Sequence, residues 1–253
     1  MKNAIEIKNL CKNYYLFDKD YKRILWLLRS KGHYGIKKAV DDISLTVKRG
    51  EVVGIIGSNG AGKSTLMSLV AGVTFPTSGD IKVNGTVGAL INLSAGFNNN
   101  YTGRENVYYK AELLGMKKTD VTKIIDEIID FADIGEYFDL PLKMYSSGMK
   151  ARVGFALAVY TNPDILIVDE VFAVGDRDFK KKSAAKTREI FKAGKTILFS
   201  SHSDQLITEF CSRVICIRNG RIAFDGGVQE SLDFYNEIKK KRRKRKTTLL
   251  KGE

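Results

Sequence analysis

The stretch G-S-N-G-A-G-K-S, from Gly57 to Ser64, decides the fold. It matches G-x-x-x-x-G-K-[ST], a loop whose backbone N–H groups surround phosphate oxygens while its lysine reaches them and its hydroxyl binds Mg²⁺. The preceding run E-V-V-G-I-I-G (Glu51 to Gly57) is typical of a strand buried on both faces, and Lys63 to Val70 is predicted to be a helix. This context predicts phosphate contacts from Gly57, Ser58, Asn59, Gly60, Ala61, Gly62, Lys63, Ser64 and Thr65.

Further strands are expected along the chain. Ile5–Leu10 and Asp41–Gly50 alternate apolar and polar residues, as half-buried strands do. Ile165–Glu170 and Lys195–Ser201 are apolar runs between helical patterns, which indicates a parallel sheet with helical crossovers. Arg213–Gly226 contains an Asn-Gly dipeptide and is predicted to be a β-hairpin that adds antiparallel strands at one side.

The middle of the chain has a helical pattern. Thr102 and Glu105 form the capping-box signature T-x-x-E, which opens a helix predicted to end near Gly115. Apolar residues at helical spacing follow, namely Val121, Ile124, Ile125, Ile128 and Ala132. We therefore expect an α/β fold in which residues 1–91 and 161–236 form a mainly parallel core, 92–160 an inserted helical subdomain, and 237–253 a basic tail.

Three side chains after apolar strands are candidates for the chemistry. Asp169 is expected to hold Mg²⁺ together with Ser64, and Glu170 to polarise a water aimed at the γ-phosphate. His202 follows the next strand in F-S-S-H-S and is expected to sense the γ-phosphate. The alternatives are that the carboxylate only caps a turn and that the lone histidine is structural.

A second helix start with anion-binding character lies at Tyr145 to Arg152, Y-S-S-G-M-K-A-R. Ser146, Ser147 and Gly148 precede the apolar run V-G-F-A-L-A-V, and serines at such a position cap helices or bind anions. Because one γ-phosphate cannot easily be reached by both helix starts, the second is expected to reach the ATP held by another copy of the chain. ATP would then hold two copies together.

In this order, the phosphate loop, Y-S-S-G-M-K, I-L-I-V-D-E, A-V-G-D and the strand ending in S-H resemble the nucleotide-binding subunit of an ATP-binding cassette (ABC) transporter. The resemblance spans Ile5 to Tyr235 and implies the RecA-like phosphate-loop core with an inserted helical subdomain. It implies that Ser146 and Gly148 contact the partner's ATP, that Asp176 lies in the D-loop, and that His202 is the switch histidine. It also places Tyr14 to stack on adenine.

Within that family, three segments are similar to bacterial exporters of capsule polysaccharide, O-antigen and teichoic acid. They are G-F-x-x-x-x-T-G-R-E-N (Gly96 to Asn106), Y-S-S-G-M-K-A-R and D-E-V-x-A-V-G-D (Asp169 to Asp176). This resemblance implies a homodimer that hydrolyses ATP with Mg²⁺. It further implies two copies of a separate membrane permease, at the cytoplasmic face of the bacterial inner membrane. Which glycan and which permease are involved stays open.

Two positions depart from the family pattern. Where most members carry a glutamine that senses Mg²⁺, this chain has L-I-N-L-S-A, and Asn92 is the candidate replacement. Ser147 and Met149 replace the glycine and glutamine of the usual L-S-G-G-Q signature. Because a serine hydroxyl also donates to phosphate, we expect activity to be retained.

The net charge of +13 is concentrated in one run, K-K-K-R-R-K-R-K at Lys239 to Lys246, without which it falls to +5. This run is interpreted as a contact for anionic lipid or the permease, as a solvated end, or, less favoured, as a nucleic-acid contact. A soluble ATPase acting on ribosomes or nucleic acid is the alternative function. It is not favoured, because such proteins usually carry two cassettes or long coiled coils.

An insert at residues 17–38 contains the apolar run Ile24–Leu28, which includes the only tryptophan, between cationic flanks. This pattern indicates an interfacial helix that contacts membrane or permease, or else a helix packed on its own core. The start M-K-N-A-I-E-I-K lacks a signal-peptide core, and no apolar run approaches the roughly 18 residues of a membrane span. The three cysteines match no metal or redox spacing and are expected to be reduced.

Overall fold

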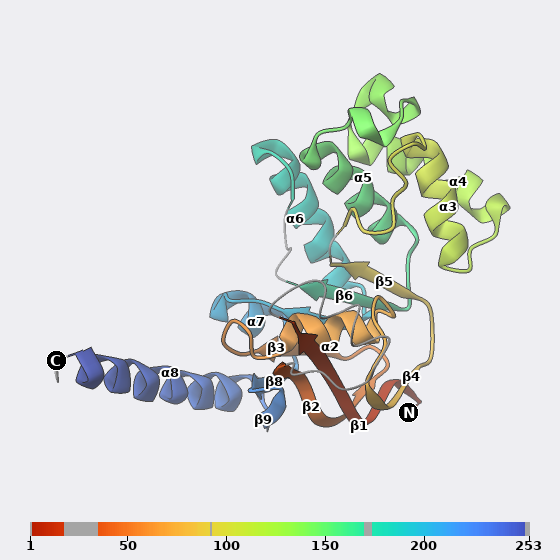
Figure 1. Ribbon diagram of the computed structural model, residues 1–253. Coiled ribbons are helices and arrows are strands. Elements are labelled where there is room, and N and C mark those ends of the chain that lie inside the picture. Colours follow the sequence, from red (N-terminus) through yellow and green to blue (C-terminus); the bar gives the residue numbers. More distant parts are fainter. Residues whose placement is uncertain (1, 18–34, 92, 170–173, 251–253) are drawn as a thin grey trace. The chain divides into compact units, whose positions relative to one another are not determined.

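The computed structural model describes residues 2–17, 35–91, 93–169 and 174–250. Its strands (Figure 1, where β7 carries no label) are β1 (Asn3–Leu16), β2 (Gly35–Lys48), β3 (Val52–Ile56), β4 (Ser78–Val83), β5 (Val87–Leu90), β6 (Ile165–Asp169), β7 (Thr196–Ser200), β8 (Arg213–Arg218) and β9 (Arg221–Gly226). Its α-helices are α2 (Lys63–Val70), α3 (Gly103–Leu113), α4 (Lys118–Ala132), α5 (Ser147–Tyr160), α6 (Arg177–Lys192), α7 (Asp204–Phe210) and α8 (Val228–Leu250). Two 3₁₀ turns follow α4, at Gly135–Asp139 and Leu142–Met144.

Backbone hydrogen bonds join the described strands into two sheets. The larger has the order β5-β6-β7-β3-β8-β9, with β5, β6 and β7 parallel and β8–β9 antiparallel. The hairpin between β8 and β9 turns at Asn219 and Gly220, both with positive φ, as the Asn-Gly dipeptide predicts. The predicted α/β class, with a mainly parallel sheet and antiparallel strands at one side, is confirmed.

A second sheet has the order β2-β1-β4, and β1 pairs with β4 in antiparallel fashion. The sequence patterns did not predict this separate sheet, because the alternation in β1 and β2 indicates strands without naming their neighbours. Both strands are longer than expected. Since β2 begins at Gly35, the last four residues of the 17–38 segment are strand; the helix predicted around Ile24–Leu28 lies outside the described residues.

Three short strands of the larger sheet are almost entirely buried. Every residue of β3 and β7 is buried, as are the first four residues of β6. Fully burying one Val, Leu or Ile side chain contributes about 1.5–3 kcal/mol, so these short runs supply much of the driving force. Because the strand interiors are apolar, polar side chains that could act chemically are found where the strands end.

The chain forms two compact units. Unit 1 comprises residues 1–4, 47–54 and 84–212, and unit 2 comprises residues 5–46, 55–83 and 213–253. Unit 1 contains β5 to β7 and the helices α3 to α7, whereas unit 2 contains the three-stranded sheet, the phosphate loop, the β8–β9 hairpin and α8. The division into a core and a 92–160 helical subdomain stays a prediction.

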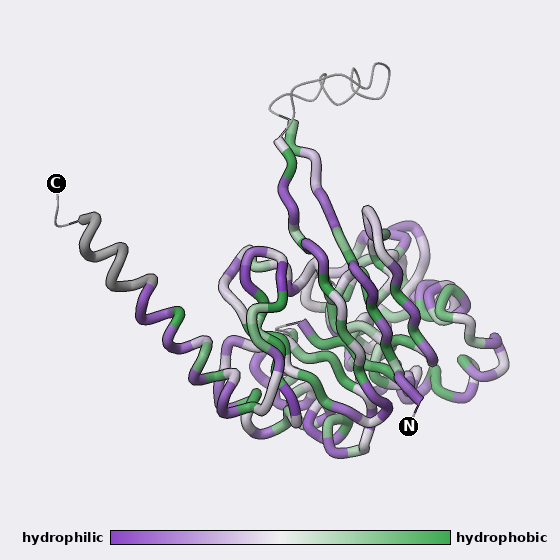
Figure 2. Tube along the Cα trace, turned by 90° about the horizontal axis from the view of Figure 1, so that it is seen from below, coloured by the Kyte–Doolittle hydropathy of each residue, from purple (hydrophilic) through white to green (hydrophobic). Residues whose placement is uncertain are grey.

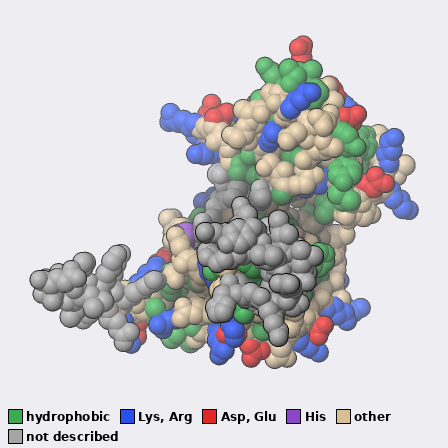
Figure 3. Space-filling view, in the orientation of Figure 1, with side chains coloured by type: hydrophobic (Ala, Val, Ile, Leu, Met, Phe, Trp, Pro, Cys, Tyr) green, Lys and Arg blue, Asp and Glu red, His purple; other side chains and the backbone are tan. Residues whose placement is uncertain are grey.

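The described elements between residues 93 and 160 are helical. Thr102 caps α3 by accepting from the Glu105 amide, and the Glu105 carboxylate accepts from the Thr102 amide, so the predicted capping box is present. Phe131 at the end of α4 packs against Phe155 and Phe179, with ring centroids 5.9 and 5.5 Å apart. In Figure 3, cationic, acidic and hydrophobic side chains are interspersed over this region.

Helix α8 includes the described part of the basic tail. Its first turns pack on the hairpin, where the Ser231 hydroxyl donates to the Val214 carbonyl and the Phe234 ring stacks on Phe224 at 5.1 Å. Figure 2 shows hydrophilic and hydrophobic residues mixed along the part of α8 that is coloured by hydropathy. No helix within the described ranges is long and apolar enough to cross a membrane.

Candidate functional site

The phosphate loop of unit 2 runs between β3 and α2, and two of its glycines allow a close approach of backbone. Gly62 has φ +111°, and a Cβ there would lie 2.2 Å from the Ala39 carbonyl oxygen. A Cβ at Gly57 would lie 2.4 Å from the Ile217 carbonyl oxygen. A side chain at either position would displace a neighbouring strand, so the packing of the loop requires glycine.

The start of α2 is built to receive an anion. Because Gly62 is the N-cap and has no side chain to cap the helix, the amides of the first turn are not satisfied by a cap side chain. The Lys63 ammonium is buried and donates to the Gly57 carbonyl at 3.0 Å across the mouth of the loop. Ser64 is exposed at the same helix start. These groups fit the phosphates and the Mg²⁺ of a bound nucleotide.

The β8–β9 hairpin is hydrogen-bonded to the phosphate loop. The Gly220 amide donates to the Ala61 carbonyl at 2.8 Å, and the Asp41 amide donates to the Gly220 carbonyl at 2.9 Å. One turn therefore ties the phosphate loop to β2. Such a connection preorganises the loop before a ligand arrives.

Unit 1 brings Asp169 beside Ser200 at the carboxyl ends of parallel strands β6 and β7. Asp169 Oδ1 and Ser200 Oγ are buried and have no hydrogen-bond partner among the described residues. Buried polar atoms without partners are costly, and a water-coordinated Mg²⁺ would satisfy a carboxylate placed in this way. His202 follows Ser200 by two residues and is exposed. Glu170 and Asn92 lie outside the described residues.

One of the two serines at the start of α5 caps that helix. Ser146 is the N-cap, and its hydroxyl accepts from the Met149 amide at 3.1 Å, while Ser147 is the first helical residue. A Cβ at Gly148 would meet only Ser146 Oγ, at 3.7 Å, so the backbone there is open to a close approach. The capping interpretation is thus correct for Ser146. Contact of Ser146, Ser147 and Gly148 with the ATP of a second copy stays a prediction.

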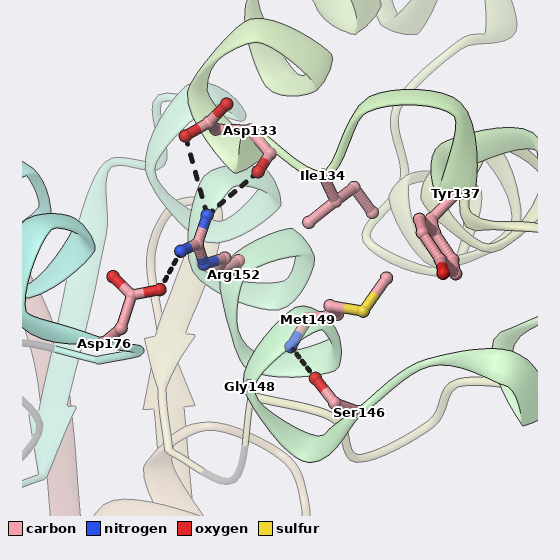
Figure 4. A pocket seen from close by; sticks show the side chains of 8 residues that line it. All are labelled: Asp133, Ile134, Tyr137, Ser146, Gly148, Met149, Arg152 and Asp176. Atoms are coloured by element: carbon pink, nitrogen blue, oxygen red, sulfur yellow. Dashed lines mark hydrogen bonds and ion pairs between the residues drawn. The ribbon is translucent and has the colours of Figure 1, made fainter.

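Helix α5 is linked to Asp176 by a side chain that the sequence reasoning missed. Figure 4 shows Arg152 pointing to Asp133 on one side and to Asp176 on the other, beside a pocket of about 490 Å³ that Ser146 and Gly148 also line. Arg152 donates to the Asp133 carbonyl at 2.9 Å and pairs with the Asp176 carboxylate. The sequence did offer one indication of this role, since Arg152 is the last residue of the motif Y-S-S-G-M-K-A-R.

Asp176 itself caps α6, since its Oδ1 accepts from the Phe179 amide at 3.0 Å. This backbone hydrogen bond and the neighbouring Arg152 guanidinium hold the pKa of the Asp176 carboxyl below its ordinary value. Its placement in a loop that reaches another subunit stays a prediction.

A second missed residue is Asn106, which closes the motif G-F-x-x-x-x-T-G-R-E-N. It is fully buried, and its Nδ2 donates to the carbonyls of Asn98, Tyr101 and Thr102 at 3.0, 3.2 and 2.8 Å. Its Oδ1 accepts from the Asn98 amide at 2.7 Å. The loop before α3 is therefore built around one side-chain amide.

Tyr14 lies on β1 and is 41% exposed. The Lys12 ammonium is 5.3 Å from its ring centroid, so one face of the ring already meets a cation. Stacking of Tyr14 on adenine stays a prediction.

Comparison with known proteins agrees with this arrangement. Residues 40–173 match the family model described as ABC transporter. A relative from Bacillus anthracis, named teichoic acids export ATP-binding protein, is 44% identical over 95% of this chain, which spans 44% of that protein. A relative from Klebsiella pneumoniae, named O-antigen export system ATP-binding protein, is 41% identical over 94% of this chain and 99% of its own length.

Solved structures show the same fold. A dimeric ATP-binding cassette bound to ADP and phosphate in a post-hydrolysis state has a TM-score of 0.66 at 21% identity, covering 88% of this chain and 98% of that one. An ATP-binding subunit of an ABC transporter has a TM-score of 0.68 at 22% identity, covering 90% and 91%. The family model covers more than half of the chain, and the loop, the acidic strand end and the second helix start are all in place. The chain therefore belongs to the ABC transporter family and carries the ATPase cassette of that family.

Proposed function

We propose that the chain is the ATP-hydrolysing subunit of a bacterial exporter of a cell-surface glycan, of the teichoic-acid, O-antigen or capsule class. Two copies close over two MgATP and move a separate permease, two copies of which lie in the membrane above them. The subunit then sits peripherally at the cytoplasmic face. The observation that carries this proposal is the phosphate loop in a chain that matches an O-antigen export protein over 99% of that protein's length.

The residues divide the work by chemistry. The amides at the start of α2 and the Lys63 ammonium would hold the phosphates. Ser64 and Asp169 would hold Mg²⁺, and the metal would supply positive charge that stabilises the phosphate oxygens. Glu170 orients the attacking water, and His202 senses the γ-phosphate. Ser146, Ser147 and Gly148 meet the nucleotide of the other copy, with Asp176 beside them. Hydrolysis removes the group that both copies bind, so the dimer opens.

The basic tail contacts anionic lipid in this proposal. Each cation near a negatively charged membrane surface contributes about 1 kcal/mol, so a run of eight binds peripherally without a membrane-spanning helix. A soluble ATPase acting on ribosomes or nucleic acid remains the competing function, and no observation in the described residues favours it.

A first experiment tests the sandwich of two copies. Glu170→Gln is expected to slow hydrolysis and to trap an MgATP-bound dimer, measured by light scattering after gel filtration. Glu189→Gln, a matched change at an exposed position of α6, should leave the protein hydrolysing ATP and returning to monomer. A Glu170→Gln protein that stays monomeric with MgATP would contradict the proposed dimer.

A second experiment tests the transport assignment. A tagged chain is recovered from gently solubilised membranes, the bound proteins are identified by mass spectrometry, and nucleic acid is assayed in the same sample. A multi-spanning membrane protein in about equal amount supports the exporter. RNA or DNA without such a protein would replace the exporter with the competing function.

A further inference from the structure

A second hollow lies within unit 2, on a wall of the phosphate loop. It has a volume of about 480 Å³ and is bounded by three segments. The segments are loop residues 58–61, hairpin residues 216–219, and Tyr235, Ile238, Lys239 and Lys241 of α8. The hollow therefore joins the nucleotide loop to the start of the basic run.

The rim of this hollow is cationic. Arg218, Lys239 and Lys241 contribute positive charge, and none of the described residues that line it is acidic. The Glu237 carboxylate lies 3.7 Å from the Lys241 ammonium, and both side chains are more than two-thirds exposed, so this pair neutralises little charge. The Lys239 ammonium lies 4.2 Å from the Tyr235 ring centroid. Like charges gathered in one hollow repel each other, and an anion relieves that repulsion.

Packing anchors the helix that carries two of these cations. Ser231 and Phe234 anchor the first turns of α8 to the hairpin, through the Val214 carbonyl and the Phe224 ring. Lys239 follows Ser231 by about two helical turns, so its position is set by that anchor. The floor of the hollow is apolar, formed by Ile217 of β8 and Ile238 of α8.

We propose that this hollow is a binding site for a phosphate group, carried on a lipid headgroup or on a small soluble molecule. The hollow shares loop residues 58–61 with the nucleotide loop, but Lys63 and Ser64 are not among the residues that line it. The three cations donate to the phosphate oxygens, and the apolar floor receives the carrier. The inference deepens the anionic contact proposed for the tail and rests on that part of the proposed function. Since the exposed Asn59 and Gly60 form one wall, an occupant also touches the nucleotide loop.

The test uses the full chain with its phosphate loop filled by saturating MgADP. Glycerol 3-phosphate binding is measured by calorimetry, and binding to phosphatidylglycerol vesicles by sedimentation, with phosphatidylcholine vesicles for comparison. Lys239→Ala should weaken binding about fivefold or more, since a charge-assisted hydrogen bond is lost. Lys240→Ala removes the same charge from the next residue, which does not line the hollow, and should change glycerol 3-phosphate binding less than about twofold. On vesicles Lys240→Ala should lose only the general attraction that one cation contributes near an anionic surface, and therefore less binding than Lys239→Ala.

Binding to vesicles alone assigns the phosphate to lipid, and binding to glycerol 3-phosphate alone assigns it to a soluble source; either supports the site when Lys239→Ala weakens it selectively. Absence of both, or equal losses in the Lys239 and Lys240 variants, overturns it. ATP hydrolysis is measured on the same samples. A protein that binds phosphate selectively but never hydrolyses ATP would count against the proposed function and leave the phosphate site standing.

Discussion

Removing Arg152 is expected to destabilise the protein strongly. Its side chain is only 15% exposed and links three elements: the end of α4, the start of α6 and its own helix α5. The change considered is Arg152→Ala, which deletes the guanidinium and leaves its partners behind.

The structure gives the magnitude. The bond from Arg152 to the Asp133 carbonyl, at 2.9 Å, has a charged donor, and such bonds contribute about 1.5–3 kcal/mol. The guanidinium also lies 4.8 Å from the Phe179 ring centroid, which adds about 0.5–1 kcal/mol. The solvent-exposed carboxylates of Asp133 and Asp176 are assigned no contribution. We therefore expect the free energy of unfolding to fall by about 2–4 kcal/mol.

Urea unfolding followed by circular dichroism measures this change as a shift of the midpoint at constant slope. Arg177→Ala is the matched control, because Arg177 is exposed and adjacent to Asp176, and it should change stability by less than about 0.5 kcal/mol. Arg152→Lys should recover less than half of the loss, since an ammonium lacks the planar fork that reaches two partners. If Arg152→Ala and Arg177→Ala unfold at the same urea concentration, the reasoning is refuted.

Three further predictions concern other parts of the chain. Gly62→Ala should abolish binding of a fluorescent ATP analogue, because the new Cβ would clash with the Ala39 carbonyl oxygen of β2. Retained binding would contradict this, since it would show that the loop can move to accept the Cβ. The pKa of Asp164 is lowered by hydrogen bonds from the Thr86 amide and hydroxyl. The ionised Asp164 carboxylate therefore stabilises the folded protein above pH 3.8, and this contribution is lost as the pH falls further. Asp164→Asn should flatten the acid limb of a pH–stability curve. Burial raises the pKa of the Cys211 thiol to about 12 and of Cys216 to about 11, so a thiol reagent at pH 8 should label half-buried Cys11 first, and fast labelling of all three would contradict this burial.

Much of the fold could be predicted because the phosphate loop imposes its own context. A glycine-rich loop must follow a strand and start a helix, and the apolar runs at β6 and β7 could only be buried strands. The separate sheet β2-β1-β4 could not be predicted, since alternation shows that a strand has one buried face but not which strand it pairs with.

Candidate site residues could be proposed from the sequence where they belong to a motif, but not where they act through tertiary contacts. Lys63, Asp169 and Ser146 could be proposed because the loop, the strand end and the helix start are local patterns; their roles stay predictions. Arg152 was missed because its partners lie 19 and 24 residues away and are brought near only by packing. From the sequence alone, a helical arginine that makes tertiary contacts cannot be distinguished from one that points to solvent.

The loop before α3 is held in its conformation by the side-chain amide of one residue, Asn106. The Nδ2 and Oδ1 atoms of Asn106 are both hydrogen-bonded to backbone groups of residues 98–102. An aspartate of the same shape would turn a carboxylate oxygen toward three carbonyls and repel them. Slow chemical ageing of this one asparagine, from amide to acid, would therefore open the loop without any change in the size of the side chain.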